Sequence, residues 1–257
     1  MVLKIILILL ILAVVAVIWR LEKNARFIVD KFRQGNVIVF GAKGKGKDLI
    51  FQKVISKRRK EKYYSNMDYG HNFNYISLVD LKLGQNTYEN FIEGVVEIID
   101  KNEQLEGADI YVSDAGIYLP AQYHYLLDKK YKSLPIFYAL SRHLYNNNVH
   151  VNTQALNRVW DKLREQADSY FKALRTLKVG GLLFTKVRYF ETYETASENR
   201  APIRRRLLNK YSKALSDEYQ AYNGLVFDMW ICQRVSKVFY DSRYFHSVVF
   251  GYEADEL

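Results

Sequence analysis

The most apolar part of the chain lies at its beginning, where the hydrophobic run Val2–Trp19 is interrupted only by Lys4. At about 1.5 Å per residue in a helix, this run matches the hydrocarbon thickness of a bilayer. It ends in Trp19 and Arg20 rather than at a small-residue cleavage site, which favours a retained anchor over a cleaved signal peptide. We therefore predict a single transmembrane helix over residues 1–20.

Shorter apolar runs in the rest of the chain alternate with segments of helical spacing, which is typical of an α/β fold. The runs Val37–Phe40, Ile110–Ser113 and Val149–Thr153 indicate buried strands. Helices are predicted after the glycine-rich loop that follows the first run, and at about 134–144, 156–164 and 203–222. A strand-like run at 180–192, with a turn at Gly180-Gly181, predicts a hairpin or sheet edge.

These elements predict an α/β core with a mostly parallel sheet, right-handed crossovers and helices on both faces, and the glycine-rich loop described next makes it a P-loop NTPase core. We assign residues 21–200 to this domain and residues 201–257 to a helical and strand extension of the same domain. No Pro-, Gly- or Ser-rich linker separates the two parts.

A glycine-rich loop follows the first predicted strand and matches the pattern GxxxxGK of a Walker A motif. Its glycines allow backbone amides to turn toward phosphate oxygens, and Lys47 supplies a positive charge opposite the β and γ phosphates. The alternative is a surface loop that binds nothing, but a strand before and a helix after favour phosphate binding. The predicted ATP-binding residues are Gly41, Ala42, Lys43, Gly44, Lys45, Gly46, Lys47, Asp48 and Leu49.

Two carboxylates are candidates for holding Mg²⁺. Asp48 stands where the motif has a Ser or Thr hydroxyl, so it can bind the ion but also brings negative charge beside the phosphates. Asp114 follows the predicted strand Ile110–Ser113, where P-loop folds place a carboxylate that positions Mg²⁺. A capping or turn role is the alternative for Asp114 considered alone. Ala115 follows it, where motor ATPases commonly carry a Glu that polarises the attacking water.

Further catalytic candidates lie downstream of these residues. Gln154 follows the predicted strand Val149–Thr153, where a polar side chain can face the γ-phosphate; a loop or capping role is the alternative. Arg164 and Arg175 are candidates for a finger that reaches the γ-phosphate of a neighbouring copy. Exposed arginines usually have no such role.

Charge is concentrated near the anchor. The net charge is +10, and residues 1–62 hold fifteen Lys and Arg against four Asp and Glu. Because most of the positive charge near the span follows it, we expect the body to be cytoplasmic. The basic cluster Lys57–Lys62 and the second one at Arg204–Arg206 can face lipid head groups, DNA or solvent.

Metal and disulfide chemistry based on cysteine or histidine is not expected. Cys232 is the only cysteine, and the five histidines lack the spacing of a zinc site. A reducing compartment fits this composition.

The order of these motifs resembles that of the Zot (zonula occludens toxin-like) family of filamentous phage assembly ATPases, which is related to the FtsK/HerA motors. The resemblance covers roughly residues 36–245. It includes the phosphate loop, the strand ending in Asp114, and the strand ending in Gln154. It also includes Ser141-Arg142-His143, Arg164 and Phe239-Tyr240-Asp241-Ser242.

This resemblance implies a viral protein of the bacterial inner membrane that uses ATP and Mg²⁺ during virion export. It implies partners as well: further copies of the chain in a homo-oligomer, other phage assembly proteins and single-stranded DNA. The chain differs at Asp48 and Ala115, and its anchor precedes the ATPase part. Two alternatives follow: a nucleotide-binding membrane scaffold that does not hydrolyse ATP, and a conjugation-type DNA coupling protein.

Overall fold

The computed structural model describes residues 2–58, 63–65, 67, 69, 75–77, 107–118, 121, 143, 146, 148–199 and 225–234. The strands are β1 (Val37–Phe40), β2 (Tyr63–Ser65), β3 (Tyr75–Ser77), β4 (Asp109–Val112), β5 (Val149–Thr153), β6 (Ser169–Val179), β7 (Leu182–Phe190) and β8 (Val226–Arg234). The helices are α1 (Val2–Gln34), α2 (Lys47–Lys57), α4 (Ala115–Tyr118), η3 (Leu156–Arg158), α7 (Asp161–Glu165) and α8 (Tyr193–Ser197).

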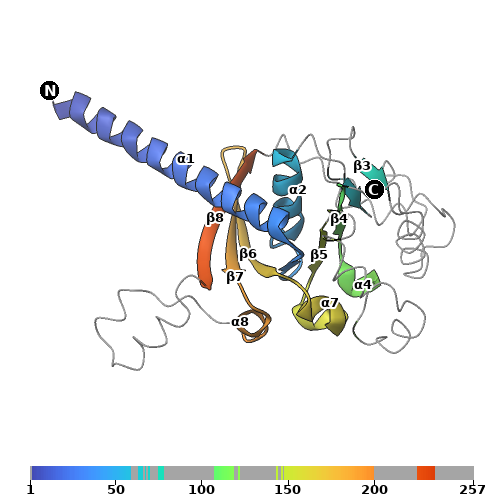
Figure 1. Cartoon of the computed structure of the whole chain (residues 1–257). Helices are drawn as coiled ribbons and strands as arrows, with labels where there is room; N and C mark the ends of the chain where they lie inside the picture. The colour runs from blue at the N-terminus through green and yellow to red at the C-terminus, as the bar shows by residue number, and fades with distance from the viewer. Residues whose placement is uncertain are drawn as a thin grey trace, which may run out of the picture.

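The strands form one 8-stranded sheet in the order β3-β2-β4-β5-β1-β6-β7-β8 (Figure 1). The first six strands in this order, from β3 through β2, β4, β5 and β1 to β6, are parallel to one another. β7 pairs antiparallel with β6, and β8 pairs antiparallel with β7 at the edge of the sheet. β1 lies between β5 and β6, and β5 separates β1 from β4. The predicted α/β fold with a mostly parallel sheet is confirmed, and the carboxyl ends of β1, β4 and β5 meet at one edge.

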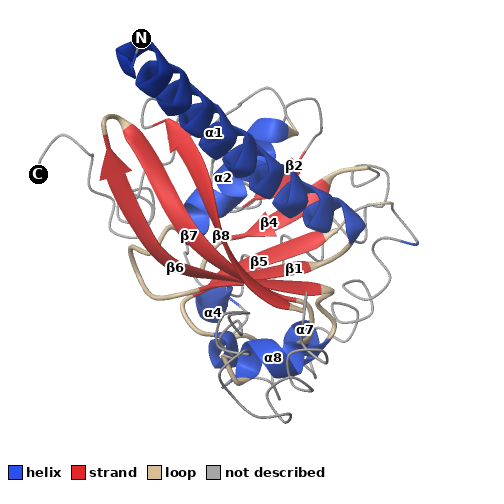
Figure 2. Ribbon diagram, turned by 90° about the vertical axis from the view of Figure 1, so that its left-hand side faces the viewer, coloured by secondary structure: helices blue, strands red, loops and turns tan. Residues whose placement is uncertain are grey.

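Each face of the sheet has its own hydrophobic core. Along β1, Val37 and Val39 pack with residues of α1 and α2, whereas Ile38 and Phe40 pack with residues of α4, α7 and α8. This alternation is what a strand with helices on both sides requires. Figure 2 shows α1 and α2 across one face and the three short helices beyond the sheet.

The amino-terminal helix α1 is continuous from the apolar segment into the body. Its hydrophobic residues as far as Trp19 are exposed, and it is long and apolar enough to cross a membrane. Farther along, Ala25, Ile28 and Phe32 are buried against the sheet. The Asn24 amide donates a hydrogen bond of 2.8 Å to the Trp230 carbonyl of β8. The predicted anchor is therefore the first part of a longer helix that also covers the core.

Local predictions differ in outcome. The strand Val149–Thr153 is confirmed with the predicted bounds, and β6 and β7 form the predicted hairpin around Gly180-Gly181. The single helix predicted at 156–164 is wrong, because Val159 is extended and Trp160 is not helical, and these two residues separate η3 from α7. Both side chains are fully buried, and the non-helical backbone lets two consecutive residues enter the core. The predicted helices at 134–144, apart from His143, and at 203–222 lie outside the described residues.

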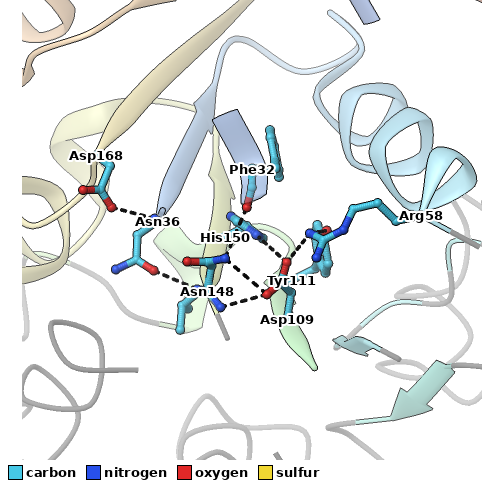
Figure 3. Close-up of polar contacts among 9 residues, drawn as sticks. Phe32, Asn36, Arg58, Asp109, Tyr111, Asn148, His150 and Asp168 are labelled. Atoms are coloured by element: carbon cyan, nitrogen blue, oxygen red, sulfur yellow. Dashed lines mark hydrogen bonds and ion pairs between the residues drawn. The ribbon is translucent and has the colours of Figure 1, made fainter. Parts of the chain in front are cut away.

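A polar network closes the sheet at the edge opposite the phosphate loop (Figure 3). Asp109, the first residue of β4, forms a buried ion pair with Arg58 and accepts a hydrogen bond of 2.8 Å from the Asn148 amide. His150 Nε2 lies 3.3 Å from the same carboxylate. This network connects the end of α2 to the beginnings of β4 and β5.

The network changes the interpretation of the basic cluster predicted at Lys57–Lys62. Arg58 pairs with Asp109 inside the protein, and Lys57 pairs with Glu22 of α1 at 2.5 Å. These two cations therefore support the packing of α2. The remaining residues of the cluster, Arg59–Lys62, lie outside the described residues, as do Arg204–Arg206.

Candidate functional site

The loop between β1 and α2 crosses the carboxyl ends of the central strands. The Gly41 amide donates to the Thr153 carbonyl of β5 at 3.2 Å, and the Thr176 hydroxyl of β6 donates to the Lys45 carbonyl at 3.0 Å. The loop is thus tied to both neighbours of β1. Strand, loop and helix stand in the order that the GxxxxGK motif predicts. This is a P-loop fold.

Two glycines of the loop are required by its close packing. A Cβ atom at Gly41 would lie 2.5 Å from the Ala173 carbonyl oxygen. Gly46 has a φ of 92°, and a Cβ atom there would lie 2.4 Å from Thr176 Oγ1. Residues with side chains at either position would displace the loop from the sheet.

Lys47 is buried at the beginning of α2. The residue as a whole is only 6% exposed. Its ammonium makes no hydrogen bond or ion pair within the described part of the chain. No side chain caps this end of the helix. Amide groups at an uncapped helix amino terminus attract anions, and a lysine ammonium without an ion pair can bind a negatively charged ligand. The arrangement therefore suits a phosphate chain.

Asp48 is the centre of a hydrogen-bonded group beside the loop. Its Oδ1 atom accepts hydrogen bonds from Asn152 Nδ2 at 2.7 Å, Ser113 Oγ at 3.2 Å and Tyr69 Oη at 3.2 Å. The hydroxyls of Tyr69 and Ser113 also lie within hydrogen-bond distance of each other, and when one donates to the other, only the second donates to Asp48. These contacts bring together α2, β5, the end of β4 and a residue after β2.

Asp114 lies at the end of β4 with a left-handed backbone, φ 50°. Its amide donates to Asn152 Oδ1 at 2.8 Å. Burial and the nearby Asp48 charge raise the pKa of Asp114, against the opposing effect of Lys47 and Lys43. The structure therefore brings Lys47, Asp48 and Asp114 to one place, as their positions in the sequence predict.

The two other predicted catalytic residues lie in different surroundings. Gln154 is exposed directly after β5, and its Oε1 accepts from Arg158 at 3.3 Å. The Arg164 guanidinium of α7 lies 5.7 Å from the ring centre of Tyr193. Within the described residues, neither side chain forms a hydrogen bond with the loop.

Sequence reasoning missed Ser113, Asn152 and Tyr69 as members of this group. A signal was present for Asn152, because a polar residue in a fully buried strand must find hydrogen bonds inside the protein. Ser113 is fully buried as well. Tyr69 belongs to no motif, and only the folded chain reveals its contact.

Comparison with known proteins gives similarity in structure but not in sequence. No protein-family model and no curated protein matches the chain. The N-terminal domain of zonular occludens toxin from Neisseria meningitidis has 16% identity and a TM-score of 0.46, covering 82% of this chain and 97% of its own.

The genome packaging NTPase B204 from Sulfolobus turreted icosahedral virus 2 is similar as well. Its complex with AMP has 14% identity and a TM-score of 0.42, covering 80% of this chain and 95% of its own. Its complex with ATP-gammaS has 14% identity and a TM-score of 0.41, covering 77% and 97%. These values compare backbone folds and assign no role to any residue of this chain.

Proposed function

We propose that this chain binds ATP at the loop Gly41–Lys47 and hydrolyses it, while α1 holds it in a membrane. The observation that carries the proposal is Lys47, which is 6% exposed at the uncapped beginning of α2 and forms no ion pair within the described chain. A triphosphate would supply a direct negative partner for its ammonium. Lys43 and Lys45 are exposed in the same loop and add to its positive charge.

The residues beside the loop fit Mg²⁺. This ion prefers oxygen ligands, and the described residues offer the carboxylates of Asp48 and Asp114 and the hydroxyl of Ser113. Mg²⁺ would neutralise charge that develops between the β and γ phosphates. The loop amides and Lys47 would bind and orient the phosphates. Gln154 would orient water, and Arg164 would act on a neighbouring copy.

The membrane part of the proposal rests on α1. Its hydrophobic residues from Val2 to Trp19 are exposed on all sides of the helix, and a bilayer would cover them. The positive charges that follow the span favour a cytoplasmic body. The resemblance to the Zot family implies that the membrane is a bacterial inner membrane. Residues beyond Trp19 would hold the body at the membrane surface.

The biological task follows from the resemblance to the Zot family. We propose virion assembly or DNA export, in which copies of the chain form a homo-oligomer. Other phage assembly proteins and single-stranded DNA are the partners that the resemblance implies. Capture of single-stranded DNA by the ATP-bound protein would distinguish export from a purely structural task.

The test uses the full chain in lipid nanodiscs. We expect binding of a labelled ATP analogue and release of phosphate from Mg-ATP, both lost in Lys47→Ala. Lys178→Ala removes an exposed lysine of the hairpin and should leave both unchanged. Absence of nucleotide binding in the wild-type chain would refute the proposed site.

A second function is favoured by Ala115, which stands where a water-polarising Glu is common. In this alternative the chain binds ATP to organise its assembly and does not hydrolyse it. Tight analogue binding with phosphate release at the background rate would select this alternative. Phosphate release that disappears in Lys47→Ala would exclude it.

A further inference from the structure

Two positions that hold magnesium in P-loop proteins carry each other's residue types in this chain. The position after the loop lysine usually carries a Ser or Thr hydroxyl, and the end of a neighbouring strand carries an Asp. Here Asp48 follows Lys47, and Ser113 follows β4. Their side chains are in contact, with Ser113 Oγ donating to Asp48 Oδ1 at 3.2 Å.

The alternation of β4 decides which residue at its end faces α2. Tyr111 packs in the core beneath α1 and α2, whereas Val112 packs in the core on the other face. Ser113 therefore faces the α2 side again, and its contact with Asp48 agrees with this. Asp114 comes next, where the backbone leaves the strand with φ 50°. Thus Ser113, rather than Asp114, stands opposite the start of α2.

The hydrogen bonds of Asp48 leave one of its oxygens available. The three donors Asn152, Ser113 and Tyr69 all reach Oδ1. Within the described part of the chain, Oδ2 accepts no hydrogen bond. A carboxylate fixed through one oxygen, with the other free beside a buried lysine, is preorganised to bind a cation.

We infer that Asp48 and Ser113 have exchanged the two magnesium-holding roles, and that Asp114 is the carboxylate that activates water. This inference rests on the proposed function and names the residues that perform it. Asp48 supplies the charged oxygen and Ser113 the hydroxyl. Asn152 positions all three residues, because it donates to Asp48 and Ser113 and accepts from the Asp114 amide at 2.8 Å.

The exchange also explains how hydrolysis can proceed with Ala115 at the position where a water-polarising Glu is common. When Ser113 occupies the magnesium position, the next residue, Asp114, occupies the position of the water-polarising acid. A carboxylate at this position can accept a proton from water. Asp114 takes a proton from water, the water oxygen bonds to the γ-phosphorus, and the bond to the β-phosphate oxygen breaks, giving ADP and phosphate.

The experiment measures affinity for a non-hydrolysable ATP analogue in nanodiscs, with and without Mg²⁺, and phosphate release from ATP. We expect Asp48→Asn to lose the Mg²⁺-dependent part of the affinity, by about tenfold or more. Asp114→Asn should keep that part of the affinity and lose phosphate release. Asp30→Asn, at an exposed carboxylate of α1, is the matched control and should change neither.

The exchange itself is tested by reversing it. Ser113→Asp alone brings two carboxylates together and should weaken analogue binding, whereas Asp48→Ser combined with Ser113→Asp should restore the Mg²⁺ dependence. Circular dichroism of each variant separates these effects from misfolding. Loss of the Mg²⁺ dependence in Asp114→Asn, with its retention in Asp48→Asn, would overturn the inference and leave the proposed function intact. A wild-type chain that binds no analogue would refute the proposed function instead.

Discussion

Arg58, the residue directly after α2, forms a buried ion pair with Asp109, the first residue of β4. The pair connects the helix after the phosphate loop to the strand that carries Ser113 and Asp114. Both side chains are at most 10% exposed, so neither charge is well solvated without the other. The ion pair therefore stabilises the relative position of α2 and β4 from the amino ends of the strands, opposite the candidate site at their carboxyl ends.

Removing one partner of this pair should destabilise the fold. Asp109→Asn leaves Arg58 buried without its counter-charge, and a cost of about 3–5 kcal/mol is expected for such a change. Replacing both residues together, as Arg58→Met with Asp109→Asn, should cost less than Asp109→Asn alone. Chemical denaturation of the full chain in detergent measures both. Equal stability of wild type and Asp109→Asn would show that the pair contributes nothing.

Acid should destabilise the protein in two stages. Burial lowers the pKa of His150 from its ordinary 6.5, although the hydrogen bond to Asp109 opposes this. The unfolded chain therefore binds a proton at this residue before the folded chain does, and stability falls as the pH drops below about 6.5. At neutral pH His150 is uncharged, and Arg58 is the charged partner of Asp109.

The second stage belongs to Asp109. Burial alone would raise its pKa, but the hydrogen bond to His150 and the Arg58 charge outweigh burial and hold the pKa below its ordinary 3.8. Its contribution is present above that pH and is lost as the pH falls through the folded-state pKa. In His150→Gln the first stage should disappear and the second remain. Denaturation midpoints between pH 8 and pH 3 test this, and an unchanged first stage would contradict it.

Gly46→Ala should impair nucleotide binding more than Gly44→Ala. Both glycines have positive φ, 92° and 75°, so each substitution costs about 1–2 kcal/mol of backbone strain. Only at Gly46 does the added Cβ meet a neighbour, Thr176 Oγ1 at 2.4 Å, whereas Gly44 faces open space. Analogue affinity of the two variants gives the comparison. Equal losses would show that the contact with β6 does not position the loop.

Charges placed in the apolar half of α1 should release the protein from membranes. Leu10 and Val14 are both more than half exposed in this segment. Arginine at the centre of a span costs about 2.5–3.5 kcal/mol per residue on insertion scales. Leu10→Arg combined with Val14→Arg should therefore lower the fraction that resists carbonate extraction, while Leu10→Phe combined with Val14→Ile should not. Full retention of the arginine variant would argue against a spanning helix.

The sequence predicts the central elements of the fold because their signals are local. The loop Gly41–Lys47, the strand Val149–Thr153 and the turn at Gly180-Gly181 each depend on neighbouring residues, and all appear in the structure. The helix predicted at 156–164 fails because burial of Trp160 overrides helical spacing. Tertiary packing of this kind cannot be inferred from periodicity alone.

The candidate site is predicted only in part. Lys47, Asp48 and Asp114 follow from motif spacing, but the contact between Asp48 and Ser113 joins residues that are 65 positions apart. It depends on β5 lying between β1 and β4, and on the alternation of side chains at the end of β4. Strand order and side-chain orientation become visible only in the folded sheet. The motif alone therefore favours Asp114 as the magnesium ligand.

Because α1 runs without a break from Val2 to Gln34, it is a rod about 50 Å long. Phe32 in the last turn of this helix is fully buried in the core, and β1 begins soon afterwards at Val37. In a bilayer, every copy of the chain would hold its phosphate loop at the same height above the lipid. Copies that diffuse together in the membrane plane would thus present their phosphate loops to one another at similar heights.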